Sequence, residues 1–192
     1  MLNYCILINH SVSSFLNSFV LNNHLQIFIW IFADLPIFFL PIFLISLWLF
    51  YNFKHIDKKE NLLYIFYATF LWIFMNFIIQ HFFYEQRPNT FITPILNHVP
   101  DNSFPSDHAV SSFAFLTVLY LFWYKKTFWV FLPFVLIMNF ARIAWGLHWF
   151  FDVVVWALIW IFAAYFIYKI YRHKYIQNLN KFILKIASFL KL

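Results

Sequence analysis

Two segments of this chain carry side chains of the types that take part in catalysis. One reads Ser-Phe-Pro-Ser-Asp-His and ends at His108, and the other contains Arg142, His148 and Asp152 within twelve residues. Histidine can act as nucleophile, acid or base near neutral pH, and a guanidinium binds two phosphate oxygens at once. Together such residues could neutralise a phosphate, attack it and protonate its leaving group.

A third segment, Tyr-Glu-Gln-Arg-Pro, places Arg87 at the start of the connection 84–107, which has no helical or strand periodicity. This connection ends where Ser106 or Asp107 is predicted to cap a helix. Free N–H groups and the positive dipole at that helix start favour an anion. Gly146, the only glycine of the chain, is predicted to serve a turn or a close backbone approach.

The elements that position these residues are predicted to be membrane-spanning helices. The chain is 64% apolar and only 10% charged, which excludes an ordinary soluble enzyme because a small globule could not hide so many apolar side chains. A span needs about 20 apolar residues, and Asp34 is predicted to cap the first span. The five predicted spans cover residues 35–53, 62–83, 108–124, 127–145 and 153–168.

The remaining parts of the chain are predicted to lie on the membrane. Residues 1–34 are predicted to be an interfacial segment with a helix over 3–24, and residues 172–192 a basic amphipathic tail. The expected fold is therefore a single all-α, polytopic membrane bundle with about five transmembrane helices. The lone Cys5 cannot form an intrachain disulfide.

Basic residues fix the expected orientation. Eleven of the 13 Lys and Arg residues lie in connections on one side of the predicted spans or in the tail, and this side is assigned to the cytoplasm. The exceptions are Arg87 and Arg142. Counted along the helices from the cytoplasmic charges, His108, Arg142 and Asp152 fall at one depth near the outer boundary. Ionisable groups at such a depth predict a functional site.

The three segments resemble the signature motifs of the type 2 phosphatidic acid phosphatase superfamily. The matching residues are Arg87-Pro88, Pro105-Ser106-x-His108 and Arg142-x5-His148-x3-Asp152, within residues 80–152. Asp107 makes the second motif most similar to that of bacterial undecaprenyl pyrophosphate phosphatases. The resemblance implies a metal-free phosphatase of lipid phosphates or diphosphates, without cofactor, in the bacterial inner membrane.

The resemblance also implies roles for individual residues. His148 would be the nucleophile that forms a phospho-histidine, Asp152 would hold its second ring nitrogen, and His108 would protonate the leaving oxygen. Phosphate binding would fall to Arg87, Ser106, Asp107 and Arg142. The chain departs from the motifs at Gln80, where the family has lysine, and at Ala141, where it has serine. Gln80 can give only a neutral hydrogen bond.

Several alternatives stay open at this point. Undecaprenyl pyrophosphate is the preferred substrate, but phosphatidylglycerophosphate, lipid A phosphate and phosphatidate fit the same motifs. A catalytically silent lipid-phosphate binder or transporter is a second class. A metal on His108, His148 and Asp152 is disfavoured, since two arginines beside them suit an anion. The net charge of +6 is assigned to anionic lipids rather than nucleic acid, and no protein partner is expected.

Overall fold

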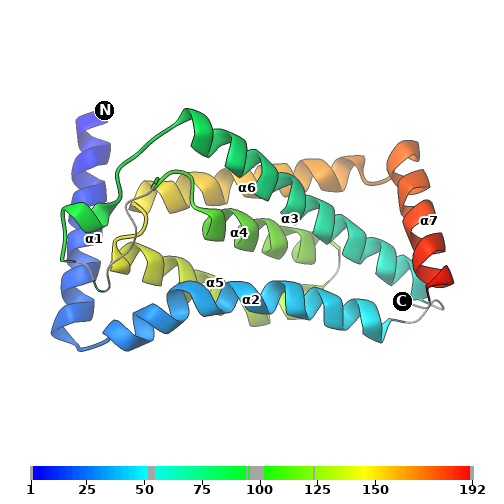
Figure 1. Ribbon diagram of the computed structural model, residues 1–192, viewed down its shortest axis with the longest axis horizontal. Coiled ribbons are helices and arrows are strands. Elements are labelled where there is room, and N and C mark those ends of the chain that lie inside the picture. The colour runs from blue at the N-terminus through cyan, green and yellow to red at the C-terminus, as the bar shows by residue number, and fades with distance from the viewer. Residues whose placement is uncertain (1, 52–54, 94, 96–101, 123, 191–192) are drawn as a thin grey trace.

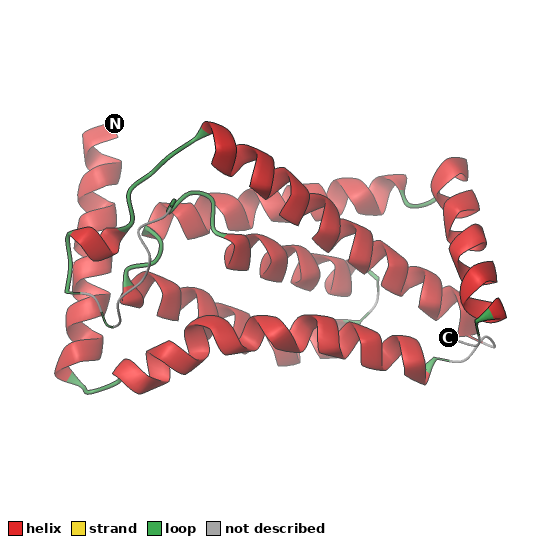
Figure 2. Ribbon diagram, in the orientation of Figure 1, coloured by secondary structure: helices red, strands yellow, loops and turns green. Residues whose placement is uncertain are grey.

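The computed structural model describes residues 2–51, 55–93, 95, 102–122 and 124–190. In these residues the regular structure is helical, and the only strand-like feature is an isolated bridge between Gln86 and Asn102 (Figure 2). The predicted all-α class is therefore confirmed. The helices are α1 (Leu2–Asn22), α2 (Gln26–Phe50), α3 (Ile56–Phe82), the short 3-10 helix η2 (Pro88–Thr90), α4 (Asp107–Leu121), α5 (Lys125–Trp145), α6 (Phe150–Ile170) and α7 (Lys174–Phe189).

Helices α2 to α6 run side by side along the long axis of the molecule, with α4 among the others (Figure 1). One face of α4 places Phe115 and Leu119 in a buried cluster with Leu62 and Ile65 of α3 and Ala164 of α6. The small residues of α4, such as serine and alanine, let its neighbours approach closely. The first turn of α4 is thereby fixed against α3, α5 and α6.

Five helices are long and apolar enough to cross a membrane, namely α1, α2, α3, α5 and α6, and α4 is a shorter apolar helix. The chain is thus a multi-pass membrane protein, and many Phe side chains on the bundle surface are exposed, as a lipid-facing surface requires. The 15 residues of α4 span about 22 Å, less than the hydrocarbon. This helix is held inside the bundle, where its ends need not reach the lipid surface.

Helices α1 and α7 cross the two opposite ends of the bundle rather than following its long axis (Figure 1). The predicted helix over 3–24 corresponds to α1, which is itself long and apolar enough to span a membrane, so its interfacial position and that of the tail stay predictions. In α7, Leu184 and Ala187 are buried, and Tyr67 of α3 donates a hydrogen bond to Asn180 at 2.9 Å. Residues 191–192 of the tail lie outside the described residues.

The predicted start of the first span is wrong. Helix α2 begins at Gln26, so Asp34 lies inside the helix instead of capping it. The apolar residues 27–33 continue the helix on the N-terminal side of Asp34. The carboxylate is tolerated inside the helix because it pairs with Arg142 of α5. The predicted end of this span, residue 53, and Lys54 beyond it lie outside the described residues.

Candidate active site

Four segments meet at the end of the bundle that α1 crosses: the start of α4, the end of α5, the start of α6 and the connection between α3 and α4 (Figure 1). Ser106 caps α4, as predicted, and its side chain accepts a hydrogen bond from the backbone N–H of Ala109 at 3.4 Å. His108 therefore lies in the first turn of α4.

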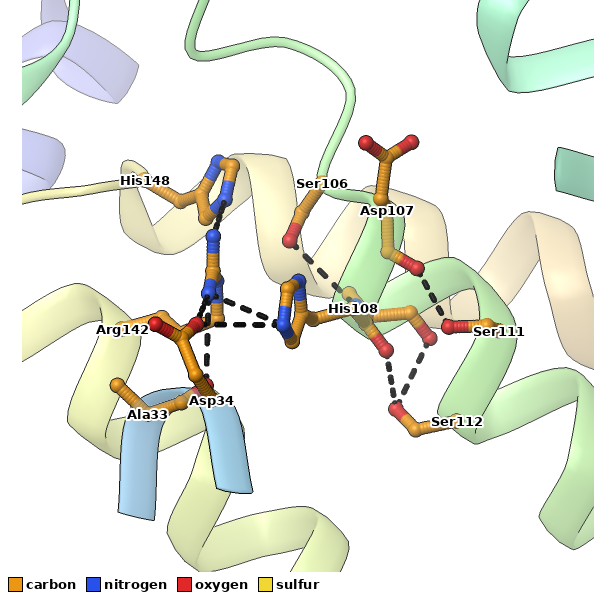
Figure 3. Close-up of polar contacts among 10 residues, drawn as sticks. Ala33, Asp34, Ser106, Asp107, His108, Ser111, Ser112, Arg142 and His148 are labelled. Atoms are coloured by element: carbon orange, nitrogen blue, oxygen red, sulfur yellow. Dashed lines mark hydrogen bonds and ion pairs between the residues drawn. The ribbon is translucent and has the colours of Figure 1, made fainter. Parts of the chain in front are cut away.

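Arg142 connects the two histidines of the site. Its Nη2 lies 3.2 Å from Nε2 of His148, and its Nη1 lies 3.2 Å from Nε2 of His108 (Figure 3). His108 and Arg142, two of the three residues predicted to share one depth, are therefore in contact, whereas their depth in the membrane stays a prediction. Arg142 is only 6% exposed, so its charge is directed at these neighbours with little screening by water.

The ring of His148 is oriented by a backbone carbonyl. Its Nδ1 lies 2.6 Å from the carbonyl oxygen of Ser103, which can only accept a hydrogen bond, so the proton sits on Nδ1. Nε2 is left with its lone pair, directed at Arg142. Burial, together with the charges of Arg142 and Arg87, holds the pKa of His148 well below its ordinary value. The imidazole is therefore neutral at neutral pH and available as a nucleophile.

The prediction that Asp152 holds the second ring nitrogen of His148 is wrong. The carbonyl oxygen of Ser103 occupies that position. Oδ2 of Asp152 instead accepts hydrogen bonds from Oγ of Ser103 at 2.6 Å and from the backbone N–H of Trp149 at 2.9 Å. The physical reason is local, since Asp152 lies in the first turn of α6 and its carboxylate turns back to the free N–H groups there. Asp152 thus reaches His148 through Ser103.

Arg87 is brought to the site by a close approach of two loops. Its Nη1 donates a hydrogen bond to the carbonyl of Leu147, beside His148. The backbone N–H of Asn89 bonds to the carbonyl of Gly146 at 2.9 Å. A Cβ on Gly146 would lie 2.9 Å from Cδ1 of Ile92, and the φ of +86° is also left-handed. Both predicted uses of glycine, the turn and the close approach, are confirmed here.

Asp107 and Gln80 are placed together, away from the two histidines. The side-chain amide of Asn76 in α3 donates to Oδ1 of Asp107, and Nε2 of Gln80 lies 3.4 Å from both of its oxygens. The Asp107 carboxylate points away from Arg142 and His148 (Figure 3). Asp107, which was predicted to bind phosphate, therefore faces α3. Gln80, at the position where the family has lysine, faces Asp107.

Asp34 and Ser103 were missed by the sequence analysis as members of the site. Oδ1 of Asp34 lies 2.5 Å from Nη1 of Arg142 and 3.3 Å from Nε2 of His108. A signal for Asp34 was present, because it is a lone carboxylate within a long apolar stretch and must find a partner in the membrane. Ser103 gave no such signal, since its contacts arise from the path of the connection.

Helix α1 holds the loops of this end in place. Asn17 donates hydrogen bonds to the carbonyls of Thr93 at 2.9 Å and Ala144 at 3.0 Å. Asn9 accepts one from the backbone N–H of Phe151 at 3.0 Å. The ring of His10 lies 4.6 Å from that of Trp149, centre to centre. The N-terminal helix therefore supports the start of α6 and the two loops around His148.

In the described part of the chain, we find no cluster of three or more His, Cys, Asp and Glu side chains arranged as metal ligands. The positive charge of the site comes instead from Arg142, which lies 3.2 Å from Nε2 of His148, and from Arg87, whose charge also lowers the pKa of His148. The arrangement can bind an anion, attack it with an imidazole and exchange a proton through a second imidazole.

Comparison with known proteins shows to which family this chain is similar. The family model described as the PAP2 superfamily matches residues 61–176, which include all three motifs. The structure of LpxE from Aquifex aeolicus is similar to this one, with a TM-score of 0.63 and 26% identity, over 76% of this chain and 86% of that chain.

Two curated relatives come from Bacillus. The bacitracin transport permease protein BcrC of Bacillus licheniformis is 35% identical over 77 residues, which cover 40% of this chain and 37% of that protein. The undecaprenyl-diphosphatase BcrC of Bacillus subtilis (strain 168) is 31% identical over 113 residues, or 58% of this chain and 56% of that protein. The matches thus span between about a third and somewhat more than half of the length of these relatives.

Proposed function

Because the chain belongs to the PAP2 superfamily, we propose that it is an integral membrane phosphatase of lipid phosphates, acting through a phospho-histidine on His148. The observation that carries this proposal is the position of Arg142, whose two Nη atoms each lie 3.2 Å from Nε2 of a different histidine. A phosphoryl group held by this guanidinium would have a nucleophile on one side and a proton donor on the other.

The reaction proceeds in two displacements. Nε2 of His148 attacks phosphorus, and the bond to the leaving oxygen breaks while His108 gives that oxygen a proton. Water then gives a proton to His108 and attacks the same phosphorus, which breaks the bond to His148 and releases inorganic phosphate. Arg87, Arg142 and the N–H groups at the start of α4 bind the phosphoryl oxygens through both steps.

An apolar groove beside the site supports a lipid substrate. A cavity of about 340 Å³ between α2, α3 and α4 is lined by Ile37, Phe38 and Phe115, and also by Ser111, one turn after His108. Phe38 also lines a second cavity that includes Asp34. A phosphate at Arg142 could therefore continue into a hydrocarbon chain along α2, within the membrane.

The preferred substrate within this proposal is undecaprenyl diphosphate, which would yield undecaprenyl phosphate. It is supported by the similarity to the Bacillus subtilis relative, which is named an undecaprenyl-diphosphatase. We place the site on the extracytoplasmic face of a bacterial inner membrane and the C-terminus in the cytoplasm. This orientation is supported by Lys58, Lys125 and Lys169, which lie at the ends of helices opposite to Arg142.

The test is phosphate release by the purified protein from a panel of undecaprenyl diphosphate, phosphatidylglycerophosphate, lipid A phosphate and phosphatidate. The matched control is His148→Asn, which keeps a donor for the carbonyl of Ser103 and removes the nucleophile. Release from the diphosphate that His148→Asn abolishes supports the proposal. Binding of these lipids with no release from any of them would instead identify a catalytically silent binder or transporter.

A further inference from the structure

One carboxylate oxygen of Asp34 contacts two residues of the proposed site. Its Oδ1 lies 2.5 Å from Nη1 of Arg142 and 3.3 Å from Nε2 of His108, and these two nitrogens lie 3.2 Å apart. The three atoms form a triangle (Figure 3). The Asp34 side chain is 49% exposed and that of Arg142 only 7%, so the carboxylate reaches the site from its open side.

The hydrogens of this triangle can be assigned. A guanidinium only donates, a carboxylate only accepts, and an imidazole nitrogen does one or the other. If Nε2 of His108 accepted a hydrogen bond from Arg142, its lone pair would also face Oδ1 of Asp34, and two acceptors would repel each other. If Nε2 carries a proton, Oδ1 accepts from both neighbours and every group is satisfied. The second arrangement is therefore the stable one.

This assignment leaves Nδ1 of His108 for the reaction. Among the described residues we find no hydrogen bond to Nδ1, and the second ring nitrogen points away from Asp34 (Figure 3). Asp34 also fixes one edge of Arg142, where Nη1 lies 3.4 Å from the carbonyl of Ala33. The other edge, at Nη2, stays directed at His148.

We propose that Asp34 is a positioning residue that keeps a proton on Nε2 of His108, so that Nδ1 serves as the acid and base of the phosphatase reaction. This inference rests on the proposed function. Nδ1 of the imidazolium gives its proton to the leaving oxygen as the bond to phosphorus breaks, and later takes one from the attacking water. The proton on Nε2 stays in place throughout, and the negative charge of Asp34 stabilises the imidazolium that is present before the first step and forms again in the second.

The test uses two aryl phosphates that differ in leaving group. Phenolate needs a proton when it leaves, whereas 4-nitrophenolate leaves readily without one. The ratio kcat/KM reports binding and phosphoryl transfer up to the first irreversible step. Since a general acid contributes about 10²-fold or more, Asp34→Asn should lower kcat/KM for phenyl phosphate about 100-fold and that for 4-nitrophenyl phosphate far less. Asp34→Glu should restore part of the loss.

The matched control is Asp57→Asn, which makes the same change at an exposed position at the opposite end of the bundle and should leave both substrates unaffected. Equal losses of kcat/KM for the two substrates in Asp34→Asn would overturn the inference, because a purely structural or phosphate-binding role would not distinguish leaving groups. A gain for both would overturn it too, by showing that the carboxylate obstructs the phosphate. A wild-type protein that cleaves neither these esters nor the lipid panel would instead contradict the proposed function.

Discussion

Nδ1 of His148 lies 2.6 Å from the carbonyl oxygen of Ser103, and this contact determines which ring nitrogen can react. The carbonyl holds the proton on Nδ1, and Nε2 faces Arg142 with its lone pair. Asp152 contributes by accepting a hydrogen bond from Oγ of Ser103. The carboxylate of the third motif therefore acts on the loop that orients the nucleophile.

Replacement of His148 should separate catalysis from stability. Both His148→Asn and His148→Ala should lose phosphate release and phosphoenzyme formation. Alanine also leaves the buried carbonyl of Ser103 without its donor, which costs about 1 to 3 kcal/mol, whereas asparagine can replace the donor. His148→Ala should therefore melt at a lower temperature than His148→Asn. Equal melting temperatures would show that the contact with Ser103 carries no stability, and retained turnover would refute the nucleophile.

The pH dependence of activity should follow the lowered pKa of His148. The nucleophile is the unprotonated ring, and a lowered pKa keeps it unprotonated to lower pH. The acid limb of kcat/KM should therefore lie below the ordinary histidine value of 6.5. The profile is measured with a diphosphate and a monophosphate substrate, because a limb that belongs to the enzyme is common to both. A limb above pH 6.5 with both substrates would contradict the buried, cation-flanked environment.

The sequence was sufficient to predict the helical bundle and the meeting of His108 with Arg142, because hydrophobic length and charge placement set helix depth directly. It failed where a side chain could choose among local partners. Asp152 at the start of α6 could reach either His148 or the free N–H groups of its own first turn, and its spacing from His148 allows both. Only the path of the 84–107 connection, which brings Ser103 to His148, decides between them.

Asp34 shows a second limit of prediction from sequence, which concerns where a membrane-spanning helix begins. A single charge without a partner ends an apolar span, and this rule predicts a boundary at Asp34. Here Arg142 lies 2.5 Å from it, so the helix continues through Asp34 at lower cost. The partner is distant in the sequence, and hydropathy along one segment carries no information about it.

Removal of divalent metal should leave the activity intact. Arg87 and Arg142 supply the positive charge around His148 that a metal would otherwise provide. Phosphate release is measured after dialysis against EDTA and again after magnesium or manganese is added. Similar rates under both conditions are expected. Activity that disappears with the chelator and returns with the metal would show that the residues alone do not neutralise the substrate.

The orientation in the membrane can be tested by labelling cysteines at the two ends of the bundle. Tyr84 and Tyr175 are 75% and 79% exposed. Tyr84 follows the C-terminal end of α3, and Tyr175 lies in the first turn of α7, which crosses the opposite end of the bundle. Tyr84→Cys and Tyr175→Cys therefore form a matched pair in a background with Cys5→Ala. In intact spheroplasts, an impermeant maleimide should label the cysteine at 84 and spare the one at 175 until the cells are lysed. The reverse pattern would invert the proposed topology.

The last prediction concerns the lysine that the family motif has at the position of Gln80. The amide of Gln80 lies 3.4 Å from both oxygens of Asp107, so the ammonium of Gln80→Lys should pair with that carboxylate before it reaches a phosphate. A double-mutant cycle with Asp107→Asn measures this pairing, and a contact of this kind is expected to give a coupling of about 0.5 to 3 kcal/mol in stability.

Because the new pair neutralises a carboxylate next to the start of α4, Gln80→Lys should also raise kcat/KM for an anionic substrate. With Asp107→Asn present, Gln80→Lys should raise stability and kcat/KM by less, since the ammonium then has no anionic partner and is costly beside the hydrocarbon. Equal effects of Gln80→Lys in the two backgrounds would mean that residue 80 acts on the substrate directly, as the motif alone suggests.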